Sequence, residues 1–316
     1  MINNKFNKIF TSIIIPTFKG EATIVKLVNQ LIKIFKNMKY EIVIINDCSP
    51  DNTHEICIDL IKKLPNLITY LKLGKNLGEH NAVMAGLKHA TGNYIIILDD
   101  DFQNPPEQAL KILDYTKNNN FDVIYTYYDE RKYNYFRNFI SKINDWSANV
   151  FLGKPRGLYL SSFKCLKRKI VDKIIEYNGP YPYIDGLILS ATSNIGSIKT
   201  EHSKRKIGKS SYSLIKLFKL YYNMITNFST LPIHISTILG ILISIISGFY
   251  ALVTIIQKLI DPNLLIGYTS IFAAIIFFAG IQLIFLGLIG EYIGKILNNV
   301  NNRPQFFIDY IKKRNE

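Results

Sequence analysis

Two long runs without a charged residue constrain this chain more than any other feature of its sequence. Residues 231–257 contain no Asp, Glu, Lys or Arg, and residues 264–290 repeat the pattern, so that each run has 27 residues. A helix needs roughly 20 apolar residues to cross a bilayer. The linker between the runs, residues 258–263, is too short to form a domain. The sequence therefore predicts two transmembrane helices joined by a short loop.

Basic residues flank this predicted hairpin on both sides. Residues 131–222 hold 18 Lys and Arg against 5 Asp and Glu, which accounts for nearly all of the net charge of +14. More Lys and Arg follow the second run, among residues 295–314. Positively charged flanks stay in the cytoplasm. We therefore expect a multi-pass protein of the cytoplasmic (inner) membrane with both termini inside, loop 258–263 outside, and no signal peptide in residues 1–10.

The basic segment before the first run has more than one interpretation. Anionic lipid headgroups or phosphates would bind such a surface. Nucleic acid is the other class of partner, but no nucleic-acid-binding motif accompanies the charge, so we expect none. Residues 136–150 and 214–228 have apolar positions at helical spacing, and such basic helices either lie in the membrane interface or pack on a sheet. The sequence leaves that choice open. The three cysteines form no CxxC pair and are expected to be reduced.

The first 130 residues alternate between strand-like and helix-like segments. Apolar runs at residues 12–16, 40–47, 68–73, 95–98 and 122–127 predict strands. Helical patterns separate them at residues 23–36, 54–64 and 82–90, and a further helix is expected after residue 106. These lengths are typical of βαβ units. The segment is therefore expected to form a parallel, doubly wound sheet with a crevice of nucleotide size.

Three consecutive carboxylates, Asp99, Asp100 and Asp101, follow the strand predicted at residues 95–98. Ligands of open α/β sheets bind at the carboxyl ends of the strands. Adjacent carboxylates repel one another unless a cation neutralises them, and oxygen ligands of this kind suit Mg²⁺ or Mn²⁺. In extended backbone, Asp99, Asp101 and Gln103 would face one side and Asp100 the other. The alternative is a solvated acidic turn; the spacing excludes an EF-hand, and no P-loop is present.

Several short motifs together resemble the family 2 glycosyltransferases that move a sugar from a nucleotide onto polyprenyl phosphate. In chain order they are IPTF at residues 15–18, NDCSPDNT at 46–53, NLG at 76–78, DDDFQNPPE at 99–107, RKIGKSSY at 205–212 and GEYIG at 290–294. The resemblance covers residues 12–304. The enzymes of this group include dolichyl-phosphate mannose synthases and bacterial polyprenyl-phosphate glucosyltransferases, which this sequence resembles. The resemblance implies a GT-A fold, a Rossmann-like and mostly parallel sheet, followed by amphipathic interface helices and two transmembrane helices.

The resemblance also implies which residues hold the donor nucleotide. Pro16, Thr17 and Asp47 would line the pocket for the base and ribose of a UDP- or GDP-sugar. The family usually has an Asn-Glu pair after the proline-containing motif, but Lys19 and Gly20 stand there in this chain. Glu21, which follows them, is therefore included as a candidate for the same pocket.

The implied catalytic residues are Asp99, Asp101 and Arg205. Asp99, Asp101 and Gln103 match the metal-binding D-x-D-x-Q motif of the family. Arg205 and Ser210 match its R-x-x-G-x-S-x-Y motif, whose arginine approaches the donor diphosphate. The guanidinium fork and the hydroxyl are suitable phosphate ligands in any case. Without the resemblance, residues 205–212 would be interpreted as a basic loop on the surface.

The acceptor implied by the resemblance is a polyprenyl phosphate, such as undecaprenyl phosphate. A phosphate monoester is largely dianionic at neutral pH, so it needs little help from a general base. Arg131 and Arg137 are candidates for holding this phosphate, and in-line attack would invert the anomeric centre. Asp100 is a conceivable base or nucleotide contact, although its expected inward direction speaks against a base.

The sequence departs from the family around the expected sugar and acceptor sites. The acidic stretch D-x-G-D-F-R-L appears as residues 159–165 with both acids lost. Asp185-Gly186 stands where an Arg-Gly pair is common. The identity of the donor sugar is therefore not implied.

We expect three parts: a nucleotide-sugar-binding GT-A domain at residues 1–130, an acceptor and interface segment at 131–230, and a transmembrane hairpin with a cytoplasmic tail at 231–316. The predicted function is inverting transfer of a sugar onto polyprenyl phosphate at the cytoplasmic face, for modification of a cell-envelope glycan. The alternatives are a catalytically silent membrane scaffold or lipid-binding partner, and a processive polysaccharide synthase. Assembly into a homo-oligomer is left open.

Overall fold

The computed structural model describes residues 10–128, 154–155, 157–179, 182–201, 231–260, 268–301 and 304–315. The chain divides into two compact units. One consists of Met1–Lys216 with Asn302–Glu316, and the other of Leu217–Asn301. The domain boundaries expected near residues 130 and 230 lie outside the described residues.

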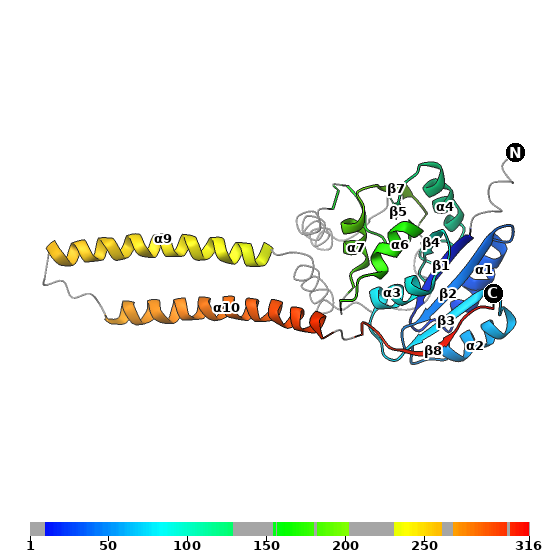
Figure 1. Ribbon diagram of the computed structural model, residues 1–316, viewed down its shortest axis with the longest axis horizontal. Coiled ribbons are helices and arrows are strands. Elements are labelled where there is room, and N and C mark those ends of the chain that lie inside the picture. The colour runs from blue at the N-terminus through cyan, green and yellow to red at the C-terminus, as the bar shows by residue number, and fades with distance from the viewer. Residues whose placement is uncertain are drawn as a thin grey trace. The chain divides into compact units, whose positions relative to one another are not determined.

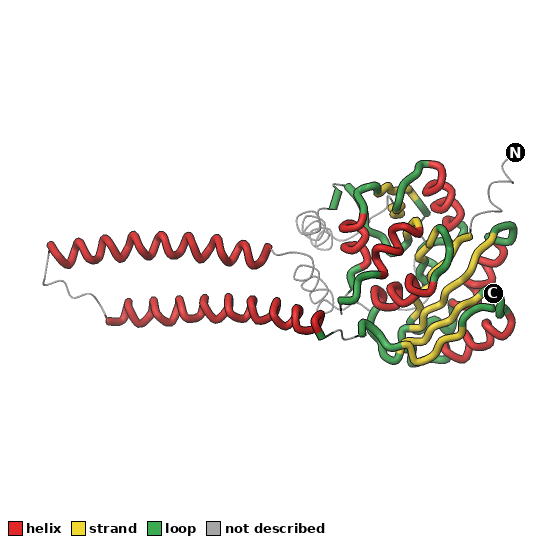
Figure 2. The backbone as a smooth tube through the Cα atoms, viewed as in Figure 1, coloured by secondary structure: helices red, strands yellow, loops and turns green. Residues whose placement is uncertain are grey.

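An eight-stranded sheet forms the centre of the first unit (Figures 1 and 2). Its strands are β1 (Phe10–Thr17), β2 (Lys39–Asn46), β3 (Ile68–Leu73), β4 (Tyr94–Ile97), β5 (Val123–Tyr127), β6 (Lys164–Lys167), β7 (Ile195–Lys199) and β8 (Ile308–Lys312). The strand order is β7-β5-β6-β4-β1-β2-β3-β8. Strands β6 and β8 run antiparallel to their neighbours, and the other pairs are parallel. The predicted strands and the mostly parallel sheet are confirmed.

Helices cover both faces of this sheet. They are α1 (Ile24–Ile34), α2 (Thr53–Lys63), α3 (Glu79–His89), α4 (Gln108–Asn118), α6 (Arg168–Ile175) and α7 (Ile184–Ala191). Because side chains alternate along a strand, Ile13 and Ile15 of β1 belong to the core cluster shared with α1, α2 and α4. Ile14 points to the other face, where α3 packs so closely that a Cβ on Gly86 would lie 2.8 Å from it. The central strands are therefore buried on both sides, as their unbroken apolar runs predict.

Strand β8 was not anticipated from the sequence. It follows the second apolar run and pairs antiparallel with β3, at the edge of the sheet. Just beyond it, Arg314 Nε donates to Glu41 Oε2 at 2.9 Å. The end of the chain is therefore part of the sheet domain. Strands β6 and β7 were also not predicted.

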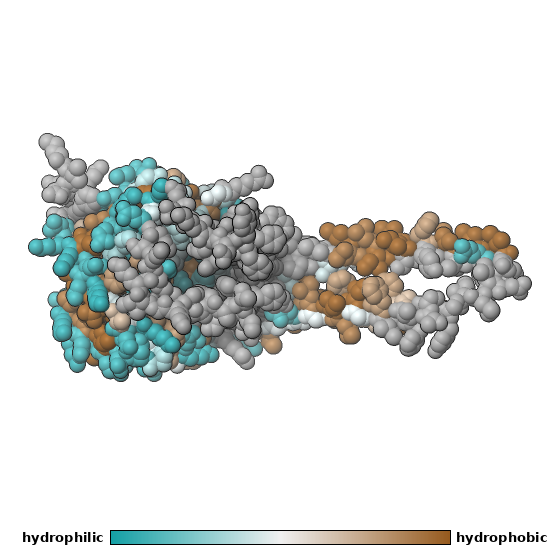
Figure 3. Space-filling model, turned by 180° about the vertical axis from the view of Figure 1, so that it is seen from behind, coloured by the Kyte–Doolittle hydropathy of each residue, from teal (hydrophilic) through white to brown (hydrophobic). Residues whose placement is uncertain are grey.

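The second unit contains the two uncharged runs. They lie in α9 (Leu231–Ile260) and α10 (Tyr268–Val300), two long helices that contact each other and run antiparallel (Figure 1). Most of their described large apolar side chains are exposed, as the brown surface in Figure 3 shows. Within the described residues, Phe277–Gly294 is the stretch long and apolar enough to cross a membrane. The amphipathic helices expected at residues 136–150 and 214–228 lie outside the described residues.

Candidate active site

The carboxyl ends of the central parallel strands meet at one edge of the sheet. The register pairs Thr17 at the end of β1 with Asn46 at the end of β2. Ile97 at the end of β4 pairs with Lys164, the first residue of the antiparallel strand β6. The segments that follow β1, β2 and β4, and the segment that precedes β6, therefore lie at the same edge. This is where an open α/β sheet binds its ligands.

The acidic turn after β4 is fixed by hydrogen bonds to its carboxylates. Ser162 Oγ donates to Asp99 Oδ2 at 2.5 Å, and the Gln103 amide donates to Asp101 Oδ1 at 3.0 Å. Phe102 has a φ of 58°, in the left-handed region. The backbone is therefore a turn and not extended at this point, so the regular alternation expected for Asp99, Asp101 and Gln103 does not apply.

Asp100 faces the loop after β1. Its Oδ2 accepts hydrogen bonds from the hydroxyls of Thr17 and Thr23. The pKa of Asp100 is raised to about 6, and burial is the largest cause. The charges of Asp99 and Asp101 raise the pKa further, and the hydrogen bond from Thr17 lowers it. Gly20 permits the approach, because a Cβ there would lie 2.5 Å from Asp100 Oδ2. Asp100 thus joins the first loop to the acidic turn.

Asp47 holds the loop that precedes α3. Its two carboxylate oxygens accept the amide hydrogens of Leu77 and Gly78, each at 2.8 Å. Burial raises the pKa of Asp47, and these two amide bonds oppose the rise. Gly78 has a φ of 89°, which favours glycine at this position. Asp47 therefore connects the ends of β2 and β3 beside the site.

The other two residues expected around the nucleotide are Pro16 and Glu21. Pro16 is buried in β1 beside Ile45. Glu21 is exposed, and its Oε2 accepts the Asn52 amide hydrogen at 3.1 Å, while its own amide donates to Asp51 at 3.3 Å. Glu21 thus connects the loop after β1 with the start of α2.

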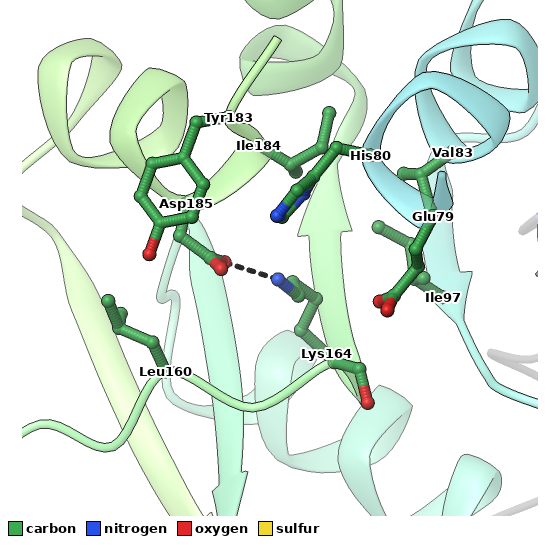
Figure 4. Close-up of a pocket in the computed structure, with 10 residues that line it drawn as sticks. Glu79, His80, Val83, Ile97, Leu160, Lys164, Tyr183, Ile184 and Asp185 are labelled. Carbon is green, nitrogen blue, oxygen red and sulfur yellow. Dashed lines mark hydrogen bonds and ion pairs between the residues drawn. The ribbon is translucent and has the colours of Figure 1, made fainter. Parts of the chain in front are cut away.

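A cavity of about 240 Å³ (Figure 4) adjoins the acidic turn, because Ser162, the hydrogen-bond partner of Asp99, is one of its lining residues. Its polar lining consists of Glu79 and His80 of α3, Ser162 and Lys164 at β6, and Tyr183 and Asp185 at α7. Figure 4 shows the Lys164 ammonium group directed at the Asp185 carboxylate, with which it forms an ion pair. Tyr125 Oη donates to the same oxygen of Asp185 at 2.8 Å.

Burial shifts the pKa values of the two α3 residues in this cavity. It raises the pKa of Glu79 to about 8, with a further increase from the charge of Asp99 and a decrease from that of Lys164. It lowers the pKa of His80 to about 4, so that this ring is neutral at pH 7. The His80 ring meets the Tyr183 ring edge-on, with 5.0 Å between their centroids.

The acidic turn has a donor set that suits a divalent cation. Within the part of the chain that the structure describes, no group of three or more His, Cys, Asp or Glu is arranged to hold a metal ion. A complete cage is not required, since Mg²⁺ binds through one or two carboxylates together with substrate phosphates. Asp99 and Asp101 could supply such a pair of carboxylates. Their charges raise the pKa values of both Asp100 and Glu79, which is the repulsion that a cation would relieve.

Sequence reasoning and structure coincide only in part at this site. The structure brings Thr17, Asp47, Asp99, Asp100 and Asp101 to one edge. The other predicted phosphate and acceptor ligands, Arg131, Arg137, Arg205 and Ser210, lie outside the described residues.

The residues that sequence reasoning missed are those of the cavity: Glu79, His80, Lys164 and Asp185. Lys164 and Asp185 stand in the two stretches that depart from the family pattern, and this departure was their only signal. Glu79 and His80 follow the NLG motif at residues 76–78, which gives no indication that the next two side chains line a cavity.

Comparisons with known proteins identify the family to which this chain belongs. Residues 12–175 match the family described as Glycosyl transferase family 2. The chain is 30% identical over 311 residues to the undecaprenyl-phosphate 4-deoxy-4-formamido-L-arabinose transferase of Proteus mirabilis, covering 97% of this chain and 94% of the relative. The protein of the same name from Photorhabdus laumondii is also 30% identical, with coverage of 95% and 93%.

The solved structures of similar fold include glucosyl-3-phosphoglycerate synthase from Mycobacterium tuberculosis. Its complex with Mn²⁺, uridine diphosphate and phosphoglyceric acid has a TM-score of 0.53 at 13% identity, covering 69% of this chain and 77% of that one. The likeness at this identity concerns the fold, which is GT-A.

Proposed function

Since the chain belongs to glycosyl transferase family 2 and is a glycosyltransferase, we propose that it moves a sugar from a nucleoside-diphosphate sugar onto undecaprenyl phosphate. One observation supports the acceptor above all others. The relatives named for transfer to undecaprenyl phosphate match 95–97% of this chain, so the likeness includes α9 and α10 as well as the sheet domain. The sugar that those relatives transfer is not assumed for this protein.

The donor nucleotide is assigned to the carboxyl edge of the sheet. Pro16, Thr17 and Asp47 line the side for the nucleoside, with Glu21 at its rim. The support for this is their position beside the acidic turn, to which Thr17 is joined through Asp100. Asp100 is a positioning residue in this proposal and not a general base, because its carboxylate is directed at the two threonines.

The donor diphosphate is assigned to the acidic turn. Asp99, Asp101 and Gln103 would hold Mg²⁺ or Mn²⁺ there, and Arg205 and Ser210 would bind the phosphates from the segment after β7. A bound divalent cation would neutralise charge on the leaving diphosphate. A guanidinium fork acts in the same way, and both contributions are larger in a site from which water is excluded.

The acceptor phosphate supplies the nucleophile. As a phosphate monoester it is mostly dianionic at pH 7, so the protein's task is to align its oxygen with the anomeric carbon. We assign Arg131 and Arg137, which follow β5 in the sequence, to hold this phosphate. Attack from the side opposite the diphosphate breaks the bond from the anomeric carbon to the leaving oxygen and inverts that carbon.

The membrane arrangement is part of the proposal. We infer that α9 and α10 cross the inner membrane as a hairpin, with both termini in the cytoplasm. The length of both helices and the Lys and Arg on their flanks support this. A membrane-impermeant thiol reagent added outside the cell should label an Asn263→Cys variant and leave Asn302→Cys unlabelled. The opposite pattern would reject this orientation.

The proposed reaction is tested by nucleoside diphosphate release. Full-length protein in vesicles that contain undecaprenyl phosphate is given a panel of UDP- and GDP-sugars with Mn²⁺, and parallel samples contain EDTA. We expect release from at least one donor, dependent on both the metal and the lipid phosphate. A silent membrane scaffold would release nothing from any donor in the panel.

A further inference from the structure

The cavity of about 240 Å³ adjoins the acidic turn directly. Ser162 forms part of its wall and also donates the 2.5 Å hydrogen bond to Asp99. Any group inside the cavity is therefore next to the position assigned to the diphosphate. Pockets for drug-sized ligands measure roughly 300–1,000 Å³. The volume found here lies below that range and is sufficient for a single sugar ring.

The most unusual feature of the cavity wall is a buried ion pair. Lys164 and Asp185 are 3% and 7% exposed. Pairs of this kind contribute little net stability, because both charges lose their hydration. Among the described residues the Lys164 ammonium group has one hydrogen-bond acceptor, Asp185, and lies 5.0 Å from the centroid of the Tyr125 ring, although it carries three N–H donors. The pair therefore presents donors and a carboxylate side by side to the interior of the cavity (Figure 4).

The charges of the lining discriminate between classes of ligand. The charge of Lys164 is matched by that of Asp185, and Glu79 adds a carboxyl group. Whether or not Glu79 is ionised, the described lining has no net positive charge. A phosphate or a carboxylate in this cavity would lose hydration without gaining an unmatched cation. A hydroxyl or an amide can use both the Lys164 donors and the Asp185 acceptor.

We propose that this cavity binds the glycosyl group of the donor, and that Lys164 and Asp185 hydrogen-bond a hydroxyl or acylamino substituent and so select uncharged sugars over uronic acids. The inference rests on the proposed function, because it requires the diphosphate at the acidic turn. Lys164 and Asp185 are specificity-determining residues in this account. His80 is neutral and packed against Tyr183, and it completes the wall without adding a charge.

Binding to the full-length protein in nanodiscs with Mn²⁺ tests this inference. UDP and GDP are compared first, to identify the base. The neutral and the uronic donor of that base are then titrated: UDP-glucose with UDP-glucuronic acid, or GDP-mannose with GDP-mannuronic acid. Three variants are compared with the parent protein: Asp185→Asn, Lys164→Met and, as a matched control on the same strand outside the cavity, Lys167→Met.

We expect the parent protein to prefer the neutral donor by about tenfold or more, the value of one charge-assisted hydrogen bond. Asp185→Asn keeps an acceptor for Tyr125 but leaves Lys164 unmatched, so the preference should fall by about tenfold. Lys164→Met should weaken the binding of the neutral donor by about tenfold. The free nucleoside diphosphate should bind equally to all variants, and Lys167→Met should match the parent protein.

Three results would overturn the inference. Unchanged sugar preference in both cavity variants would show that the pair does not contact the sugar. Equal loss of affinity for the free nucleoside diphosphate and the sugar donors would show that the pair only maintains the fold. If neither UDP nor GDP binds the parent protein, the proposed function itself is wrong and the inference is rejected with it.

Discussion

Ser162 donates a hydrogen bond to Asp99, with 2.5 Å between Oγ and Oδ2, and this bond joins the two halves of the site. Asp99 belongs to the turn after β4, and Ser162 precedes β6, the antiparallel strand next to it. The acidic turn and the sugar-sized cavity therefore share a wall. A substrate with a diphosphate and a sugar could occupy both at once, and the predictions below rest on that arrangement.

Replacing Asp101 by Ala should abolish transfer and leave the fold intact. The variant removes one of the two carboxylates assigned to the cation, and with it charge stabilisation of the leaving diphosphate. Asp59→Ala, at an exposed ion pair on α2, is the matched control and should be fully active. Nucleoside diphosphate release over a titration of Mn²⁺ measures the effect. Parent-like activity with the same metal dependence in Asp101→Ala would remove Asp101 from the metal site.

Arg205→Lys should impair transfer, whereas Lys204→Arg and Lys206→Arg should not. A planar guanidinium binds a diphosphate through two donors, and an ammonium group cannot reproduce this contact. Hydrogen bonds to charged groups contribute roughly 1.5–3 kcal/mol, so the rate should fall on the order of tenfold to a hundredfold. Membrane association is measured in parallel and should be equal in all three variants. Full activity of Arg205→Lys would assign the basic run at residues 204–206 to the lipid surface.

Because His80 is buried as a neutral ring, the fold should be less stable in mild acid than at pH 7. The pKa of His80 is lowered to about 4 in the folded protein, against about 6.5 in an unfolded chain. Well above pH 6.5 the ring is neutral in both states and this contribution to stability is complete. As the pH falls from 6.5 towards 4, the unfolded state binds a proton that the folded state excludes. Between pH 7 and 5 the parent protein should lose on the order of 1 kcal/mol more than His80→Gln. Thermal unfolding at both pH values would show this, and identical losses would contradict it.

Arg314→Met should destabilise the sheet domain although it lies near the end of the chain. Glu41, 1% exposed, accepts hydrogen bonds from Ser12, Thr91 and Arg314, and the variant removes the cation from that buried carboxylate. The expected cost is about 1.5–3 kcal/mol. Lys313→Met, at the neighbouring exposed position, should be neutral. Equal melting temperatures of the two variants would show that the C-terminal strand does not depend on this ion pair.

The central strands and the acidic turn could be predicted because local chemistry determines them. Unbroken β-branched runs such as Ile13 to Ile15 have few alternatives to a strand that is buried on both faces. Asp99 to Asp101 had to end such a strand, since three carboxylates cannot continue into the core. The two uncharged runs similarly predicted the long helices α9 and α10 from length and composition.

The rest of the site depends on contacts between distant segments, which local patterns do not encode. Lys164 and Asp185 are ordinary surface residue types. They form a buried pair because β6 inserts beside β4 and α7 carries Asp185 to Lys164. Strand β8 is short and bears charged side chains, so its pattern does not differ from that of a tail. The turn at Asp99 to Gln103 differs from the extended backbone assumed for it because Phe102 adopts a left-handed conformation.

The mass of the lipid product tests the central claim most directly. Full-length protein is reconstituted in vesicles with undecaprenyl phosphate, supplied with Mn²⁺ and the donor that the screen identifies, and the extracted lipid is analysed by mass spectrometry. We predict a new lipid heavier than undecaprenyl phosphate by one glycosyl residue, with a single phosphate, formed in equal amount to the released nucleoside diphosphate. Release of the nucleoside diphosphate with free sugar in the water and unchanged lipid would contradict the account.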